Sequence, residues 1–228
     1  MPGMVIKSDF PLIPGSWLHE AYETSYRKDM DKARRLLEDN GWKIANNVLF
    51  KKIDGKNVYL NIELLVNEDN QYRVLIAERI KEGLKEIGIN VEVKKTSWDE
   101  ASQRIHEKDF DMVITGYRTT SMPDITYMYA SKYSSPNMGF QFADGMNLAN
   151  YSNDKVDSYF EYIFSEQDYN KRKDLYYKLF KIIDEDVPYI GLYFYNNAIV
   201  YNKSVRGNLS PFTWDVLNNI VEWYIPER

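Results

Sequence analysis

The residues whose types and spacing could do chemistry are concentrated between positions 109 and 157. An apolar run over 112–117 ends at a glycine and an aromatic residue, polar residues without a repeat follow over 118–124, and 150–157 reads as a loop entering a helix. Ligands of open α/β sheets bind just beyond the carboxyl ends of strands. Polar and aromatic residues gathered at such a point are what a binding cleft requires. We therefore expect a ligand-binding cleft in this segment.

Catalytic and metal-binding patterns are missing from the sequence. The only histidines are His19 and His106, with no nucleophile motif beside either, and there is no cysteine. Asp109 and Asp111 lack the alternating oxygen ligands and central glycine of a calcium loop, so solvation at the start of a strand is the preferred interpretation. No glycine-rich phosphate loop occurs. We expect no catalytic residue, no metal site and no cofactor.

The bulk composition is that of a soluble globular protein. Of 228 residues, 44% are hydrophobic and 28% are charged, and the formal net charge is -5. That charge argues against a nucleic-acid partner, because phosphate binding needs clustered Lys and Arg. No run approaches the ~18 apolar residues of a membrane span, and Met1 to Met4 show no signal-peptide pattern. Aromatic residues are abundant at 15%, including 19 tyrosines, which suit wet binding surfaces as well as cores.

The first half of the chain predicts alternating strands and helices. An extended linker over 5–17 is followed by a helix over 29–41, and Asp54-Gly55 joins strands over 48–53 and 58–66 as a hairpin. A helix over 71–87 precedes a strand over 90–95. Ser97 and Glu100 then form a capping box that starts a helix to about residue 107, before a strand over 112–117. This order predicts an α/β fold, in which crossover helices connect parallel strands.

The second half predicts helices and then a long strand. Apolar residues recur at helical spacing over 153–164 and again over 169–184, where Pro188 ends the helical region. Residues 189–201 are aromatic and β-branched, which predicts one long strand. The remainder, 203–228, contains Gly207, Pro211 and Pro226 and is expected to be loop with short elements.

Several motifs, taken in order, resemble those of the family 5 extracellular solute-binding proteins of the peptide/nickel type. Met30 to Trp42 is similar to the family's "D-x-x-K-A-x-x-L-L-x-x-A-G-W" helix. Phe110 to Tyr117 resembles "F-D-x-x-x-x-G-W", Tyr151 to Asp157 resembles "Y-x-N-x-x-V-D", and Arg172 to Tyr189 resembles the family's later helix, which ends at a proline and an aromatic residue. The resemblance covers nearly the whole chain.

This resemblance implies the carboxy-terminal half of a two-lobe clamshell. The fold would be a periplasmic-binding-protein-like (type II) lobe, a mixed sheet flanked by helices, with a β-hairpin and a carboxy-terminal strand and tail that return to a first lobe missing from this chain. Residues 1–16 would be a linker and hinge crossing, 17–188 the second lobe, and 189–228 the second hinge strand and tail. Without the first lobe, Tyr195, Ile199 and Val200 would lose their usual cover, as would Tyr193 and Trp214.

The resemblance also implies where a ligand would lie. We expect the ligand-binding residues to be Tyr117, Arg118, Thr119, Thr120, Asp124, Asn147 and Tyr151. Peptide binders of the family carry an aspartate soon after the "G-W" pair, where this chain has Arg118 to Met122 instead. Asp124 could take that role, the ligand could lack a free amine, or Arg118 could meet a carboxylate. Asp124 could equally be a turn residue before a helix, and Tyr117 and Tyr151 could line the cleft or pack in the core.

The implied function is solute capture for an ABC importer, without catalysis. The ligand would be an oligopeptide held between lobes that close about a hinge, and the partners would be the importer's permease subunits. The full-length protein would be extracellular, either a cell-surface lipoprotein or periplasmic, touching the membrane only through a lipid anchor on its missing amino terminus. Alternatives are another cargo on the same fold, such as a nickel chelate, an oligosaccharide or a sensed peptide signal. An α/β hydrolase-type enzyme ranks last.

Overall fold

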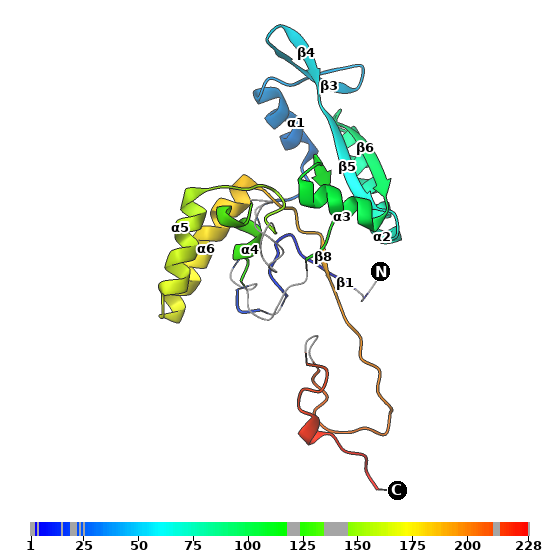
Figure 1. Cartoon of the computed structure of the whole chain (residues 1–228), viewed down its shortest axis with the longest axis vertical. Helices are drawn as coiled ribbons and strands as arrows, with labels where there is room; N and C mark the ends of the chain where they lie inside the picture. The colour runs from blue at the N-terminus through cyan, green and yellow to red at the C-terminus, as the bar shows by residue number, and fades with distance from the viewer. Residues whose placement is uncertain are drawn as a thin grey trace.

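The computed structural model describes residues 3, 5–14, 16–18, 22, 24, 26–117, 124–134, 146–211 and 215–227. Figure 1 shows these residues as two packed bodies, one holding β2 to β7 with α1 to α3 and the other holding α4 to α6, with an extended tail running to the carboxyl end. Each body has its own cluster of buried apolar side chains. The candidate site lies where the chain leaves the first body after residue 113 and leads toward the second.

The centre of the first body is a three-stranded parallel sheet. β5 (Asn61–Asn67) lies between β6 (Asn90–Thr96) and β7 (Met112–Val113), and Leu65 is in register with Val113. Leu64, Leu65 and Val66 are all fully buried, so both faces of β5 are covered. The parallel arrangement and crossover helices predicted from the sequence are confirmed. The last strand is shorter than the predicted 112–117, because beyond Ile114 the chain leaves the sheet.

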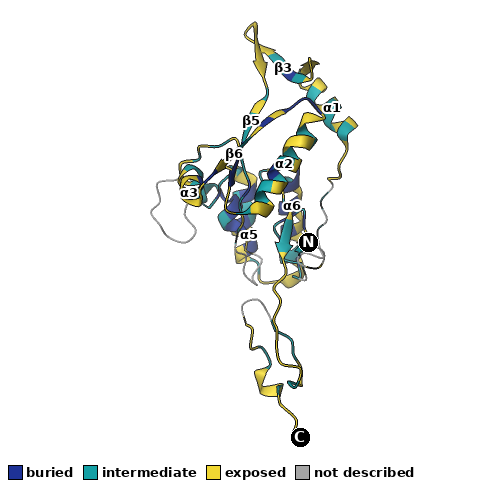
Figure 2. Ribbon diagram, turned by 90° about the vertical axis from the view of Figure 1, so that its right-hand side faces the viewer, coloured by how far each residue is buried: buried dark blue, intermediate teal, exposed yellow. Residues whose placement is uncertain are grey.

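The two crossover helices begin and end where their capping residues predict. α2 (Gln71–Lys85) starts at Asn70, whose side chain accepts the Arg73 amide, and the chain turns away at Gly88 with a φ of +83°. α3 (Trp98–Glu107) starts at Ser97, whose hydroxyl accepts the Glu100 amide, as the capping box requires. Figure 2 shows both helices beside the sheet, with their outer surfaces exposed.

A small antiparallel sheet extends the first body. α1 (Met30–Asp39) leads to β2 (Lys43–Ala45), β3 (Val48–Ile53) and β4 (Lys56–Tyr59), paired in that order. The hairpin turn at Asp54-Gly55 is confirmed, with positive φ at both residues as a two-residue primed turn requires. The single strand expected over 58–66 is wrong. The chain divides it at Leu60 into β4 of this sheet and β5 of the parallel sheet, because each half pairs with different neighbours.

The second body is built from two long helices and a short one. α5 (Asp154–Ser165) packs against α6 (Tyr169–Asp186), with α4 (Thr126–Tyr129) and the 3-10 turn η2 (Ser131–Tyr133) nearby. Phe10, Leu12 and Leu18 are buried in the same cluster as these helices. The segment expected to be only an extended linker therefore also supplies core side chains.

Two short strands, one before and one after the two bodies in the sequence, pair with each other. β1 (Val5–Lys7) pairs antiparallel with β8 (Tyr193–Tyr195), and the ribbon continues to Gly191, whose amide donates to the Asp9 carbonyl. A side chain at Gly191 would come within 2.6 Å of Ser8 and Asp9 backbone atoms, so only glycine fits this approach. The long strand expected over 189–201 is wrong, since β1 offers a partner to three residues only.

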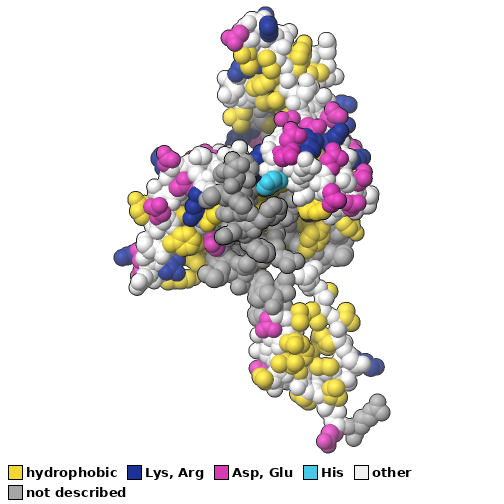
Figure 3. All heavy atoms as spheres, in the orientation of Figure 1, with side chains coloured by type: hydrophobic (Ala, Val, Ile, Leu, Met, Phe, Trp, Pro, Cys, Tyr) yellow, Lys and Arg dark blue, Asp and Glu magenta, His cyan; other side chains and the backbone are white. Residues whose placement is uncertain are grey.

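The tail after β8 has little regular structure and much apolar surface. An isolated bridge joins Arg206 to Tyr224, and η3 (Ile220–Glu222) is its short helix. Figure 3 shows hydrophobic side chains gathered on its surface. Val200 is 95% exposed and Val221 is 93% exposed. Tyr195 and Ile199 are also exposed, which agrees with the expected loss of cover; Trp214 lies outside the described residues.

Candidate ligand-binding site

The candidate site begins at the carboxyl edge of the parallel sheet. β5 ends at Asn67 and β6 at Thr96, and β7 leads through Ile114 to Gly116 and Tyr117. Because the three strands run in the same direction, these ends share one edge. That edge is where open α/β sheets bind ligands, and it is the location predicted from the sequence.

Tyr117 connects this edge to the second body. Its hydroxyl donates to the Met146 carbonyl at 2.9 Å and lies 3.3 Å from the Tyr189 hydroxyl. Its ring packs edge-on against Tyr189, with centroids 5.9 Å apart, and tilts against Tyr127 at 6.0 Å. Burial, followed by the charge and hydrogen bond of Tyr189, raises the pKa of the Tyr117 phenol far above its ordinary value. Tyr117 is therefore a neutral group shared between the cleft edge and the core.

Further tyrosines form a continuous cluster with Tyr117. Tyr129 is 1% exposed and packs edge-on against both Tyr189 and Tyr151. The Tyr189 hydroxyl accepts the Ala149 amide at 3.2 Å. Burial raises the pKa of Tyr127, Tyr129 and Tyr189. The cluster offers ring faces and neutral hydroxyl groups, which suit recognition of neutral polar and apolar groups rather than proton transfer at neutral pH.

Asn147 holds the loop that carries Tyr151. It is fully buried, and its side-chain amide donates to the carbonyls of Ala130 and Tyr151 while its oxygen accepts the Tyr151 amide. Its own carbonyl accepts the Lys108 ammonium at 2.8 Å. Through these hydrogen bonds the Asn147 side chain fixes the loop from within.

Tyr151 ends in a hydrogen bond to a carboxylate. Its hydroxyl donates to Asp186 at 2.5 Å, and the Asn153 side chain donates to the same oxygen at 2.9 Å. Burial, and then the bond to Asp186, raises the pKa of Tyr151. Asn153 also caps α5 by accepting the amides of Lys155 and Val156. The Tyr151 loop is thus joined to the end of α6 and to the start of α5 together.

Asp124 is exposed and occupies a turn position. Its carboxylate accepts the Thr126 amide at 2.9 Å, directly before α4. This is the turn role weighed from the sequence. After burial, its charge also contributes to the raised pKa values of Tyr127 and Tyr176. Arg118, Thr119 and Thr120 lie outside the described residues.

The structure therefore brings together four of the residues predicted for the site: Tyr117, Asp124, Asn147 and Tyr151. It adds Tyr127, Tyr129 and Tyr189, which sequence reasoning assigned to a helix and to the hinge strand. The signal that could have found them is the density of tyrosine on both sides of the polar segment.

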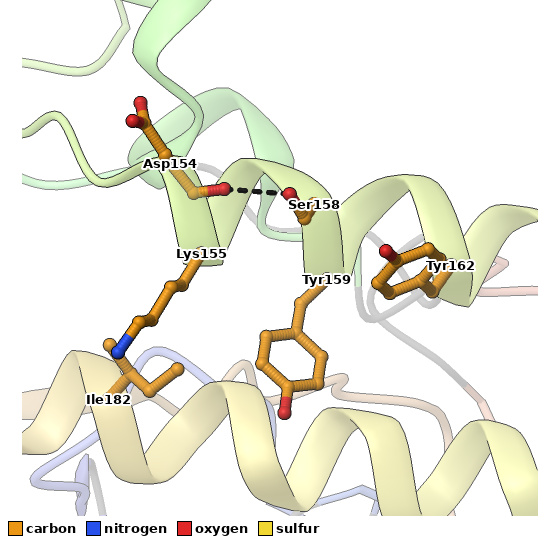
Figure 4. A pocket seen from close by; sticks show the side chains of 6 residues that line it. All are labelled: Asp154, Lys155, Ser158, Tyr159, Tyr162 and Ile182. Carbon is orange, nitrogen blue, oxygen red and sulfur yellow. Dashed lines mark hydrogen bonds between the residues drawn. The ribbon is translucent and has the colours of Figure 1, made fainter.

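A surface hollow of about 540 Å³ lies away from this edge, between α5 and α6. Figure 4 shows Lys155 and Tyr159 pointing from α5 toward α6, where Ile182 lies beneath them, and the Ser158 hydroxyl bonded to the Asp154 carbonyl at 2.9 Å. Its lining comes from neighbouring turns of two packed helices and joins no strand end. It has none of the loop-borne polar groups that mark the sheet edge.

The described ranges also lack two other kinds of feature. No group of three or more His, Cys, Asp or Glu side chains among them could hold a metal ion. No helix among them is long and apolar enough to cross a membrane.

Comparison with known proteins gives a consistent set of similarities. The family model for bacterial extracellular solute-binding proteins, family 5 Middle, matches residues 2–139. The oligopeptide-binding protein AppA of Bacillus subtilis is 29% identical over 226 residues, covering 94% of this chain and 38% of AppA. The chain thus spans less than half the length of this relative.

Solved structures show the same fold. AppA from Bacillus subtilis in complex with a nonapeptide superposes with a TM-score of 0.70 at 27% identity, over 99% of this chain and 43% of that one. NikZ from Campylobacter jejuni in complex with Ni(L-His) superposes with a TM-score of 0.77 at 24% identity, over 96% of this chain and 43% of that one. These superpositions confirm the predicted fold class, a periplasmic-binding-protein-like α/β lobe.

Proposed function

This chain belongs to the family 5 bacterial extracellular solute-binding proteins, and from that premise we propose that it is part of an oligopeptide-capture protein of an ABC importer. The observation that carries the proposal is the similarity to AppA, an oligopeptide-binding protein, over 94% of the chain. The family and its structural neighbours are solute-binding proteins and not enzymes. Capture without catalysis is consistent with a site made of neutral tyrosines.

The proposed organisation is a second lobe between two hinge crossings. Residues 1–16 and 189–228 would be the crossings and tail, and 17–188 the lobe. Pairing of β1 with β8, with the close approach at Gly191, supports this division, because hinge crossings that run side by side bend together. Some core side chains from the first crossing, such as Phe10, join the lobe itself. A first lobe in the longer protein would complete the cleft.

The proposed ligand face is the carboxyl edge of the parallel sheet with the loops beside it. Tyr117, Arg118, Thr119, Thr120, Asp124 and Tyr151 would contact the ligand, and Asn147 would position the Tyr151 loop. Tyrosine hydroxyls together with bridging waters suit a peptide backbone, whose amides are neutral and polar.

The remaining assignments follow from the same premise. The longer protein would work outside the cytoplasmic membrane, in the periplasm or at the cell surface through a lipid anchor, and would deliver its ligand to permease subunits. Another cargo on the same fold, such as a nickel chelate, an oligosaccharide or a sensed peptide signal, is the alternative. The cargo test below separates peptides from a nickel chelate and from an oligosaccharide.

The test is calorimetry on the longest natural form of the protein that contains these residues. A mixed pool of short peptides should release heat and raise the melting temperature, whereas nickel-histidine and oligosaccharides should do neither. Tyr117→Ala should weaken peptide binding, and the matched variant Tyr59→Ala, at an exposed tyrosine of the hairpin, should not. Heat only with nickel-histidine or a sugar, or with no ligand at all, would overturn the peptide proposal.

A further inference from the structure

Arg73 stands at the same sheet edge as the tyrosine cluster. Only Glu68 to Asn70 separate the end of β5 from α2, so the first turn of α2 lies beside the strand ends. Arg73 is in that first turn, and the Asn70 side chain accepts its amide at 3.1 Å. Its side chain is half-buried. A fixed cation therefore stands at the edge where the ligand is expected.

One hydrogen bond orients the guanidinium group, which also lies close to Gly116. One terminal nitrogen donates to the Asn67 side-chain oxygen at 2.8 Å, and Asn67 is itself 7% exposed. The other terminal nitrogen lies 3.2 Å from the position that a Cβ on Gly116 would occupy. The absence of a side chain at Gly116 thus lets the guanidinium lie against the chain directly before Tyr117. Tyr193 of β8 is near enough for the Arg73 charge to oppose the rise in its pKa.

The partner that orients Arg73 is neutral. No Asp or Glu of the described residues lies within 4.0 Å of its nitrogens. Arg104 provides the contrast, since it is held between Glu63 at 2.6 Å and Asp109 at 2.9 Å. An amide fixes the direction of a guanidinium without neutralising its charge. Arg73 is therefore oriented, as a binding residue must be, and keeps its charge available.

We infer that Arg73, held by Asn67 and admitted by Gly116, binds a carboxylate of the captured ligand. A guanidinium matches a carboxylate with two parallel hydrogen bonds. The inference rests on the proposed function, because it assumes that this edge is the ligand cleft. The carboxylate could be the terminal group of a peptide or an acidic side chain within it.

The experiment compares variants and ligands in the longest natural form of the protein. The variants are Arg73→Gln, Arg73→Lys, Gly116→Ala and the matched control Arg79→Gln, whose residue lies on the same helix in an exposed ion pair with Glu82. The ligands are one short peptide with a free or an amidated carboxyl end, the same peptide with Glu or Gln inside it, and citrate. Dissociation constants come from calorimetry, and melting temperatures monitor folding.

We expect a loss of affinity only for ligands that carry one particular carboxylate. Arg73→Gln should weaken the peptide bearing that carboxylate by about tenfold to a hundredfold, while leaving its neutral counterpart unchanged. Arg73→Lys and Gly116→Ala should give smaller losses of the same kind, because they keep the charge and disturb its geometry. They also keep the test decisive if Arg73→Gln fails to fold. Arg79→Gln should change nothing.

The outcomes separate this inference from the proposed function. The variants could weaken peptide binding equally for charged and neutral ligands, or leave it unchanged. Either result would overturn the role of Arg73 and leave peptide capture standing. Binding of citrate alone, with dependence on Arg73, would support the carboxylate site and overturn peptide capture. A wild-type protein that binds none of these ligands would end both proposals.

Discussion

The tyrosine cluster beside α4 to α6 and the tail after β8 are equally rich in large apolar residues, yet they differ sharply in burial. Tyr129 is 1% exposed and is surrounded by other rings, whereas Tyr224 is 58% exposed in the tail. Figure 2 shows the contrast as dark α5 and α6 against a mostly exposed tail. Composition is therefore not what distinguishes the two regions.

The difference lies in what each region has to pack against. The buried cluster of the second body, which includes the tyrosine cluster, takes side chains from the amino-terminal segment, from α4 to α6 and from Tyr189. The described residues of the tail bond mainly to one another, as in the bridge between Arg206 and Tyr224 and the bond from the Asn218 side chain to the Ser210 carbonyl. Contiguous exposed apolar surface marks an interaction site. We read the tail as a surface whose partner belongs to the proposed first lobe.

The largest effect should come from a substitution inside the helical cluster. Phe180 is fully buried, and its ring contacts those of Phe10, Tyr22 and Tyr176. Phe180→Ala should lower the free energy of unfolding by roughly 3–5 kcal/mol, since it removes a buried ring and leaves a cavity. Urea unfolding followed by circular dichroism measures the change.

The matched substitution in the tail is Tyr201→Ala. Tyr201 is 49% exposed, so its removal should change the free energy of unfolding by no more than about 0.5 kcal/mol. Equal losses for Phe180→Ala and Tyr201→Ala would show that the tail is packed as tightly as the core, and the comparison would fail.

The next largest loss of stability should come from substituting Asn147, the buried polar residue beside the tyrosine cluster. Asn147→Ala removes the hydrogen bonds to Ala130 and Tyr151 and leaves their backbone groups buried. The loss should be about 1–3 kcal/mol in the free energy of unfolding. Asn147→Asp keeps the acceptor for the Tyr151 amide but cannot donate when ionised, so a comparable loss for this variant would assign the effect to the donated bonds. No loss from either variant would show that the loop holds without Asn147.

Much of the fold could be predicted because its signals are local. Asn70, Ser97 and Asn153 cap helices where their sequence context indicates, and the Asp54-Gly55 turn adopts the backbone that such a pair favours. The errors arose where pairing depends on distant residues. The run 58–66 divides between two sheets, and 189–201 pairs only where β1 reaches it.

The site was predictable in position and less so in composition. Parallel strands fix the edge, so the strand end at Tyr117 and the loop at Tyr151 could be located from the sequence, while their contact with a ligand remains a prediction. Arg73, which we infer to bind the ligand, was not predicted, because its neighbours Asn67 and Gly116 lie at the ends of two different parts of the sheet. Asp124 differs from Arg73, because its bond to the Thr126 amide is local. The turn role that this bond gives it was one of the two roles considered from the sequence.

The buried tyrosines should also make the cluster sensitive to alkali. Burial, with a smaller effect of the Asp124 charge, raises the pKa of Tyr176 to about 12, while an unfolded tyrosine ionises near about 10. Between these values the unfolded chain releases protons that the folded chain keeps, so stability is full below about pH 10 and falls as pH rises toward about 12. Tyr176 alone should contribute on the order of 2 kcal/mol to that fall.

The measurement is urea unfolding across the same pH range for the wild type and for Tyr176→Phe. The variant should show a shallower fall of stability with pH than the wild type. Parallel slopes for the two proteins would mean that Tyr176 ionises as easily in the folded chain as in the unfolded one.

The smallest change in the free energy of unfolding should come from a substitution in the exposed tail. The same substitution should cost more in a longer protein, where the proposed first lobe would cover the tail. Val221 is 93% exposed, so Val221→Ser should change the free energy of unfolding by no more than about 0.5 kcal/mol here. In a longer natural form that includes a first lobe, the same change should cost roughly 1–3 kcal/mol, because the valine would then be buried. Val58→Ser, on the exposed hairpin, serves as the control and should have the same small effect in both lengths. If Val221→Ser stayed near zero in the longer protein, the tail would not be the surface that the first lobe covers, and its exposure would have no connection with the clamshell.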